Sequence, residues 1–145
     1  MDRDEERKIE WECKRILTRL CLYNDTRNFD EMANLFTPDG VWFRLGEALI
    51  GRENIRKEME ARPAGVLVQQ VLSNVLVTVI DADHAEAISY KSIYRHEEGE
   101  KLDKPVALDG PKWVSVYNES LVRLDEGWRI ARKEGLTLFE RDPAP

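Results

Sequence analysis

Few side chains in this sequence could bind a transition metal or form a disulfide. The chain has two histidines, His84 and His96, and two cysteines, Cys13 and Cys21. They do not form the closely spaced Cys/His cluster of a metal site, so no metal ion is expected. Both cysteines belong to one predicted helix, whose rise separates their backbones by about 12 Å. That distance is too long for a disulfide, and we interpret both cysteines as small buried residues.

The side chains that could exchange protons or hold a ring are scattered along the chain. His96 ends a predicted strand and shares one face with Tyr94, so both are candidates for a pocket wall. Alternatively, His96 is a solvated residue beside two glutamates. His84 lies in a predicted turn and receives no role. Trp42, Tyr94 and Trp113 could line a site for a flat or cyclic ligand, although aromatic residues on strands usually pack in the core.

Hydrophobic periodicity divides the elements that must position these residues into two groups. Apolar residues at helical spacing predict an amphipathic helix from Asp4 to Asp25. The remaining predicted elements are a short helix after Asn28, one early strand near 41–43, a helix over 51–63, and four long strands, at 66–80, at 85–96 and on both sides of the Asp125–Gly127 turn. Helices followed by an antiparallel meander indicate an α+β fold.

Length, composition and charge exclude several classes of protein. A chain of 145 residues is large enough for one domain with a sizeable core, so we expect a single domain over 1–145. The net charge of -6 argues against nucleic acid as a partner. No apolar run is long enough to cross a membrane, and the charged N-terminus is unlike a secretory signal. We therefore expect a cytoplasmic protein.

One long segment lacks any periodic pattern. Residues 97–111 contain five acidic side chains, two lysines and two prolines. A connection of this length is either a solvated hairpin loop or a mobile lid, and loop statistics favour the first interpretation.

Six landmarks follow one another along the chain in an order that is specific as a set. They are Asp25 at the end of the first helix, then Leu35–Trp42, Gly51–Ile55, Leu72–Val77, Tyr117–Asn118 and Arg123–Ile130. Together they resemble the SnoaL-like branch of the nuclear-transport-factor-2-like superfamily. The resemblance covers the chain from about Glu10 to Phe139.

The resemblance implies a specific three-dimensional arrangement. Three N-terminal helices would pack in the concave face of a strongly curved mixed or antiparallel sheet, giving an α+β cone that is open at one end. Relatives usually form dimers through the outer sheet face, so a homodimer is expected. The superfamily includes polyketide cyclases, scytalone-type dehydratases, ketosteroid isomerases and small subunits of ring-hydroxylating dioxygenases. The fold therefore supplies a pocket and leaves the chemistry open.

The resemblance also points to Asp25 as the candidate catalytic residue. Asp25 falls where dehydratase and cyclase relatives carry a pocket aspartate, and burial there would raise its pKa towards neutrality. The alternative is that Asp25 only bonds nearby amides in a polar loop. Gln70 stands where dehydratase-like relatives place a histidine, and it cannot titrate. It could orient a substrate or bond the backbone at a strand end. A second proton carrier would then be Tyr23, Tyr94, His96 or water.

Two strand positions complete the candidate site. Asn118 follows Tyr117 where relatives often have Asp, and the apolar residues in phase with Asn118 predict that it faces the pocket. The base of ketosteroid isomerases has its nearest equivalent at Arg44, which cannot accept a proton, so isomerase chemistry of that type is excluded.

These residues support one leading function and two alternatives. The leading hypothesis is a cofactor-free enzyme for dehydration, cyclisation or isomerisation of a cyclic, mostly apolar small molecule. Asp25 would act as base, and Tyr23, Trp42, Gln70, Tyr94, His96 and Asn118 would bind the substrate. The alternatives are a non-catalytic ligand-binding protein and the small subunit of an aromatic-ring-hydroxylating dioxygenase.

Overall fold

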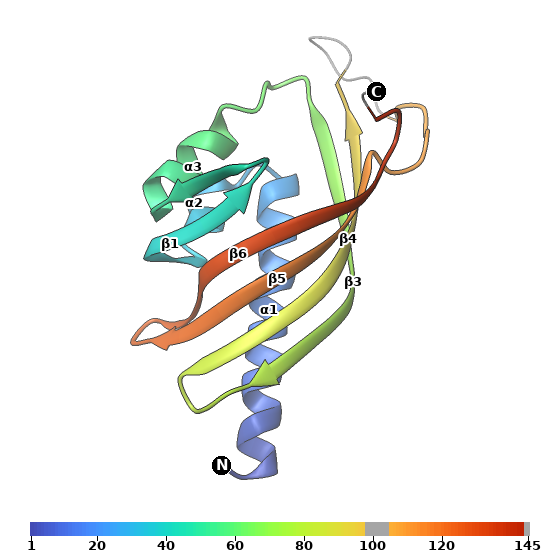
Figure 1. Cartoon of the computed structure of the whole chain (residues 1–145). Helices are drawn as coiled ribbons and strands as arrows, with labels where there is room; N and C mark the ends of the chain where they lie inside the picture. The colour runs from blue at the N-terminus through green and yellow to red at the C-terminus, as the bar shows by residue number, and fades with distance from the viewer. Residues whose placement is uncertain (98–104, 144–145) are drawn as a thin grey trace.

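The computed structural model describes residues 1–97 and 105–143. These residues form three helices and six strands (Figure 1). The helices are α1 (Arg3–Asp25), α2 (Phe29–Ala33) and α3 (Arg52–Glu60), and the strands are β1 (Phe36–Arg44), β2 (Glu47–Ile50), β3 (Leu67–Val79), β4 (His84–His96), β5 (Trp113–Leu124) and β6 (Gly127–Glu140). The α+β class predicted from the sequence is confirmed.

The six strands form one mixed sheet in the order β2-β1-β6-β5-β4-β3. Strands β3 to β6 are the predicted antiparallel meander, and β1 joins the sheet by pairing parallel to β6. The short strand β2 was not predicted. It pairs with β1 across a turn in which Leu45 and Gly46 both have positive φ. Four residues are too few to show a clear alternation of polar and apolar side chains.

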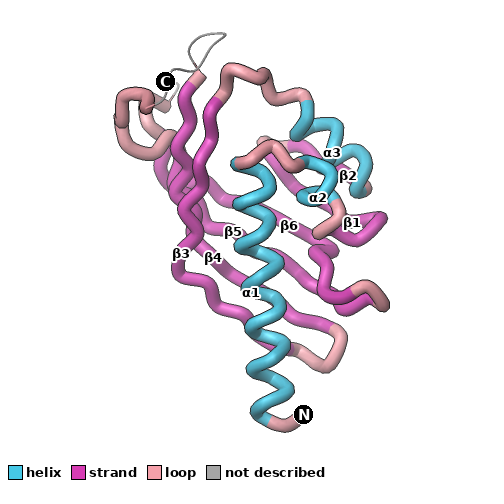
Figure 2. Tube along the Cα trace, turned by 180° about the vertical axis from the view of Figure 1, so that it is seen from behind, coloured by secondary structure: helices cyan, strands magenta, loops and turns pink. Residues whose placement is uncertain are grey.

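The three helices lie on one face of this sheet, as Figure 2 shows. We call this the concave face. The long helix α1 runs along β3 to β6, while α2 and α3 sit beside β1 and β2. The apolar side of α1, including Ile9, Leu17 and Leu20, packs in one core with Phe36 and Ile130. Burying these side chains stabilises the position of α1 on the sheet.

Both cysteines of α1 are buried and free, as the spacing predicted. Burial raises the pKa of the Cys13 thiol to about 12. Cys13 is therefore protonated at neutral pH and behaves as a small apolar residue.

Irregular positions in the ladders accompany the bend of the long strands. The register of β3 against β4 shifts between Ser73 and Leu76, and Asn74 in this interval has a positive φ of 53°. The ladder of β5 and β6 shifts at two further places. Such bulges increase local twist and bend a strand. Figure 1 shows that the long strands β3 to β6 curve along their length.

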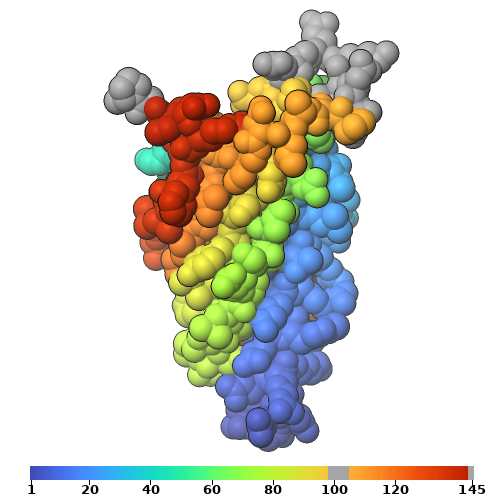
Figure 3. All heavy atoms as spheres, turned by 90° about the vertical axis from the view of Figure 1, so that its right-hand side faces the viewer, coloured from blue at the N-terminus to red at the C-terminus, as the bar shows by residue number. Residues whose placement is uncertain are grey.

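Side chains of β3 to β6 cover the face of the sheet that is turned away from the helices. In the space-filling view they form adjacent diagonal bands from β6 through β3 to α1 (Figure 3). We call this the outer face. None of the described helices is both long enough and apolar enough to span a membrane.

Candidate active site

A cavity of about 330 Å³ lies between the concave face, β1 and the segment after α3. Its volume is at the lower end of the range for small-molecule pockets. The lining contains aromatic, cationic and amide side chains: Trp42, Phe43, Trp113 and Tyr117; Arg44, Arg62 and Arg95; Asn24 and Gln70. The cavity therefore offers apolar surface together with polar groups that could orient a bound molecule.

Asp25, the last residue of α1, lies next to this cavity and does not cap its own loop. Its Oδ2 accepts a hydrogen bond of 2.8 Å from the backbone N–H of Gln70. Its Oδ1 is buried and has no partner among the described residues. Burial raises the pKa of Asp25 to about 6, although the Gln70 N–H and the charges of Arg62 and Lys91 act in the opposite direction. Asp25 can therefore exchange a proton near neutral pH.

The structure brings Gln70 and Asp25 together, but through the main chain of Gln70. The Gln70 side chain lines the cavity, and its Oε1 is buried with no hydrogen-bond partner in the described structure. Asp25 is not itself among the lining residues; it adjoins the cavity through its chain neighbour Asn24 and its hydrogen-bond partner Gln70, and both Asp25 Oδ1 and Gln70 Oε1 are buried without a partner. Buried polar atoms without a partner are rare in native proteins and are often explained by function.

Two arginines fix the backbone around Asp25. Arg62 donates to Oδ1 and to the carbonyl oxygen of Asn24, at 2.6 and 2.7 Å. Arg27 donates to the carbonyl oxygens of Arg62, Pro63 and Val66 at 2.5 to 3.1 Å. These bonds tie the end of α1 to the segment between α3 and β3. The position of the carboxyl group is therefore determined by several independent contacts.

Sequence reasoning missed a group of charged side chains inside the fold. Lys133 Nζ lies 2.8 Å from Glu119 Oε1, and both side chains are essentially inaccessible to water. Lys91 is also buried. Both ammonium groups lie against the ring of Tyr117, with Lys133 Nζ 3.9 Å and Lys91 Nζ 4.4 Å from its centre. Burial lowers the pKa of Lys133 to about 8, and the charge of Glu119 limits this decrease.

A signal for these residues exists in the strand alternation. Lys91 is in phase with the buried Ala85, Ala87 and Ser89 of β4. Glu119 is likewise in phase with the buried Leu121 of β5. A charged residue at an inward position of a strand is uncommon and marks a paired or functional group.

Trp42 lines the cavity, as expected, and is itself buried. Its ring stacks against Phe36 with centres 6.2 Å apart. Trp113 lines the same cavity. Tyr23, in contrast, is half-buried against the hydrophobic core and is not among the residues that line the cavity.

The predicted orientation of Asn118 is wrong. Asn118 is exposed on the outer face, whereas Ser115 and Glu119 are buried on the concave face. The prediction took the more apolar set of alternate residues on β5 as the inner set. The inner set contains Ser115, Tyr117 and Glu119, because this part of the interior is a polar cavity, so the apolar criterion selected the opposite face.

Tyr94 and His96 also lie away from the Asp25 cavity. They pair with Gln69 and Leu67 across β3 and β4, in the opposite phase to the inward Ile93. Together they line a second cavity of about 490 Å³ beside residues 106–110. The expectation that they bind the same ligand as Asp25 is therefore wrong.

Part of the 97–111 segment, residues 98–104, lies outside the described residues, so the choice between loop and lid stays a prediction.

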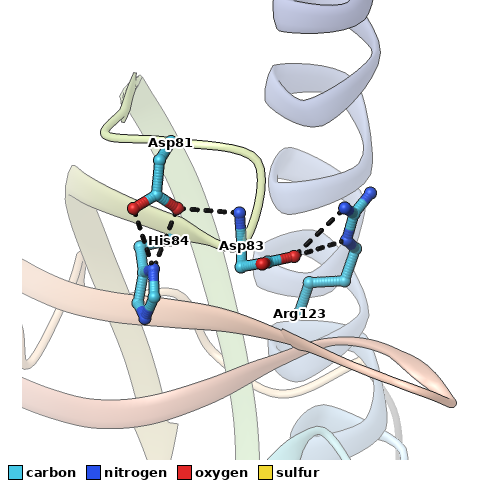
Figure 4. Close-up of polar contacts among 4 residues, drawn as sticks. All are labelled: Asp81, Asp83, His84 and Arg123. Atoms are coloured by element: carbon cyan, nitrogen blue, oxygen red, sulfur yellow. Dashed lines mark hydrogen bonds and ion pairs between the residues drawn. The ribbon is translucent and has the colours of Figure 1, made fainter.

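His84 belongs to a polar cluster at the β3–β4 turn, which Figure 4 shows. Its Nδ1 lies 2.9 Å from Asp81 Oδ1, which also accepts from the backbone N–H of Asp83 at 2.8 Å. Arg123 of β5 donates to Asp83 Oδ1 at 3.1 Å. All four side chains are largely exposed. These contacts define a turn. Among the described residues, no group of three His, Cys, Asp or Glu side chains could hold a metal ion.

Comparison with solved structures places this fold among known proteins. A candidate scytalone dehydratase from Novosphingobium aromaticivorans superposes with a TM-score of 0.82 at 18% identity, covering 98% of this chain and 92% of that one. A protein from the same species with a cystatin-like fold gives 0.78 at 20% identity, with 97% and 88% covered. A hexachlorocyclohexane dehydrochlorinase from Novosphingobium barchaimii gives 0.76 at 12% identity, with 97% and 93% covered. At these identities the similarity shows the fold alone.

Sequence comparison gives the family. No curated protein sequence matches this chain significantly. The family model described as the SnoaL-like domain matches residues 5–134, which is most of the chain. With the cystatin-like neighbours, this match shows that the chain belongs to the SnoaL-like branch of the nuclear-transport-factor-2-like superfamily.

Proposed function

We propose that this protein is a cofactor-free enzyme that moves a proton on a cyclic small molecule, with Asp25 as the proton acceptor. The observation that carries the proposal is the state of the Asp25 carboxyl group. One oxygen is held by the Gln70 N–H, the other is buried without a partner, and burial raises the pKa to about 6. A general base is most useful when its pKa lies near the working pH.

The chemistry follows from a carboxylate that is about nine-tenths ionised at pH 7. Ionised Asp25 takes a proton from a carbon next to a substrate carbonyl and becomes a neutral carboxylic acid. The electron pair of the broken C–H bond moves to the carbonyl oxygen, giving an enolate. Returning the proton to another carbon completes an isomerisation. Alternatively, the hydroxyl group leaves from the β-carbon with its electron pair and receives, directly or through a water molecule, the proton that Asp25 took, which releases water, regenerates ionised Asp25 and completes a dehydration.

Three further groups support this assignment. The guanidinium of Arg62 is a positive charge on the wall beside Asp25 and can stabilise an enolate. The amide of Gln70 and the ring of Trp42 line the same cavity and can orient a cyclic substrate. Two structural neighbours are named for a dehydration and a dehydrochlorination. Both reactions remove a hydrogen from one carbon and a leaving group from its neighbour.

Exchange of carbon-bound hydrogen in deuterium oxide tests the proposal. The protein is incubated with cyclic ketones and β-hydroxy ketones, and deuterium uptake at the α-carbon is followed by mass spectrometry. We expect Asp25→Asn to reduce the fastest exchange by about 10²–10⁴-fold. Asp39→Asn, which removes an exposed carboxylate elsewhere, is the matched control. Equal exchange in wild type and Asp25→Asn would refute the proposal.

The state of the purified protein, together with the exchange assay, addresses the two alternatives. A ligand-binding protein would retain a small molecule and catalyse no exchange. A dioxygenase subunit would co-purify with a larger iron-containing chain.

The cytoplasmic location expected from the sequence stays a prediction.

We also propose a homodimer through the outer face. Exposed apolar side chains gather there, among them Val71, Ile88, Tyr90 and Leu136. Tyr90 and Leu136 both pair with Val116 and therefore lie in one row across β4, β5 and β6. Exposed apolar patches of this kind mark interaction surfaces. Sedimentation analysis should give a dimer for the wild type and a monomer for Leu136→Glu. A monomeric wild type at micromolar concentration would contradict this assignment.

A further inference from the structure

The wall of the Asp25 cavity carries a charge opposite to that of the whole chain. The chain has a net charge of -6. Three arginines line the cavity, Arg44, Arg62 and Arg95, whereas Glu58 is the only acidic lining residue in the described structure. A concave site with one sign of charge concentrates ligands of the other sign.

Asp25 is the nearby negative charge at Arg62, but it does not reach ion-pair distance in the part of the chain that the structure describes. Arg62 takes part in no ion pair there, and its buried Nε has no hydrogen-bond acceptor. Burial and the positive charges of Arg27 and Arg95 lower the pKa of Arg62 to about 10. An anion in the cavity would relieve this crowding of positive charge.

The other two arginines are held only by weak surface pairs. Arg44 lies 3.5 Å from Glu58, and Arg95 contacts Glu97, with both carboxylates about half exposed or more. Ion pairs of this kind contribute about 0–1 kcal/mol. Both guanidinium groups can therefore turn to a ligand at little cost in free energy.

The floor of the cavity adds to the positive potential. Tyr117 lines the cavity, and the ammonium groups of Lys91 and Lys133 both lie against its ring. Glu119 pairs with Lys133 alone. Lys91 is in no ion pair with a described residue. Charges in a buried, low-dielectric region act over a longer range than charges in water.

Aromatic surface accompanies these cations. The guanidinium of Arg44 lies 5.6 Å from the centre of the Trp42 ring, and that of Arg95 lies 5.9 Å from the centre of the Trp113 ring. Each arginine therefore places a cation beside an aromatic face that lines the cavity. This pairing suits a molecule with an apolar ring and an attached anionic group.

We infer that the ligand of this cavity is a cyclic or aromatic carboxylate, whose ring packs between Trp42 and Trp113 and whose carboxylate binds the arginines. This inference rests on the proposed function and names the substrate class of the same site. It also differs from the sequence-based expectation of a mostly apolar substrate. The permanent charge of the ligand would anchor it, which leaves Asp25 to act on the ring.

Binding of matched acid and amide probes tests the inference without any assay of turnover. Benzoate and cyclohexanecarboxylate are titrated by ligand-observed NMR, alongside benzamide and cyclohexanecarboxamide. We expect at least one acid to bind about tenfold more tightly than its amide, and the difference to shrink when salt is raised from about 20 to 500 mM. The inference is overturned when no acid binds more tightly than its amide, which includes the case in which neither binds.

Arginine variants locate the anion. Arg95→Met keeps the long apolar stem and removes the charge, and it should weaken binding of the acid about fivefold or more while leaving the amide within twofold. Arg44→Met is the second variant, used when Arg95→Met fails to fold. Arg123→Met removes the same charge at the β3–β4 turn and should leave binding of the acid unchanged. Wild-type affinity for the acid in the folded cavity variants would overturn the inference.

Asp25→Asn separates this inference from the proposed function. Removal of a negative charge beside the cavity should leave acid binding equal or tighter. Loss of hydrogen exchange without any preference for acids would overturn the inference alone. A preference for acids with full exchange in Asp25→Asn would refute only the catalytic role of Asp25.

Discussion

Two charged clusters of this protein contain similar residue types and differ in their environment. At the β3–β4 turn, Asp81 contacts His84, and Asp83 binds Arg123, all in contact with water. Inside the fold, Asp25, Gln70 and Arg62 each have a buried polar atom with no partner in the described structure. An Asp-His pair is the residue combination one would first search for as a catalytic dyad. Here burial and unpartnered atoms, and not residue type, distinguish the candidate site from a turn.

The largest expected effect comes from breaking the buried ion pair. Glu119→Gln leaves the charge of Lys133 uncompensated in a region without water, which should reduce the free energy of unfolding by about 3–5 kcal/mol. The matched change at the turn, Asp83→Asn, removes an exposed partner of Arg123 and should reduce it by less than about 1 kcal/mol. Urea unfolding of both variants gives the comparison. An equal decrease in the free energy of unfolding for Glu119→Gln and Asp83→Asn would show that the Glu119–Lys133 pair is not desolvated.

The two aspartates should affect stability with opposite pH dependence. The pKa of Asp25 is raised from 3.8 to about 6 in the folded protein, so its contribution favours folding at low pH and is lost as the pH rises through about 6. Asn cannot ionise, so the stability of Asp25→Asn should not fall as the pH rises through about 6. The free energy of unfolding of Asp25→Asn at pH 7 should therefore exceed that of wild type by about 1–3 kcal/mol.

Asp81 provides the contrast. The Asp83 N–H and His84 lower the pKa of Asp81, so its contribution is present at neutral pH and lost as the pH falls through its folded value. Asp81→Asn should therefore be less stable than wild type at pH 7 and equal to it in acid. Denaturation at pH 3 and pH 7 checks both signs. If both variants changed the free energy of unfolding at pH 7 in the same direction, the two clusters would not differ in the environment of their aspartates.

A smaller effect is expected from filling the space beside Tyr117. A Cβ on Gly135 would lie 2.6 Å from a ring carbon of Tyr117. Because this ring packs against two buried lysines, Gly135→Ala should displace it and destabilise the protein by about 1–2 kcal/mol. Glu134→Ala, on the exposed neighbour, is the control. An unchanged melting temperature for Gly135→Ala would show that the ring moves freely.

The smallest effect is expected at His84. His84→Ala removes an exposed contact to Asp81 and should change the free energy of unfolding by less than about 0.5 kcal/mol. It should also leave hydrogen exchange on any substrate unchanged. Loss of exchange would place a functional group at the turn.

The sequence predicted most of the fold because long elements carry long periodic patterns. The helix ending at Asp25 and the meander after residue 66 contain many repeats of their period, so their class was clear. The short strand β2 offered only four residues and was missed. The parallel pairing of β1 with β6 joins residues more than ninety positions apart and has no local signal.

The candidate site could be predicted only in part. Asp25, Gln70 and Trp42 were proposed from the family resemblance or from aromatic character; Gln70 and Trp42 line the cavity, and Asp25 adjoins it through Gln70. Asn118 was placed on the wrong face because apolar residues were assumed to point inwards. This assumption fails where the interior is a charged cavity. The same assumption hid Lys91 and Glu119, although both are in phase with buried residues of their strands.

The pKa of the Asp25 carboxyl group tests the central claim most directly. It can be measured by carbon-detected NMR of protein labelled with ¹³C at aspartate, with Asp25→Asn identifying the resonance. We expect a midpoint of about 6 for Asp25, with Asp81 titrating below its ordinary value in the same spectra. A midpoint for Asp25 near or below 4 would show a solvated or fully bonded carboxylate, and it would contradict the role of Asp25 as a base.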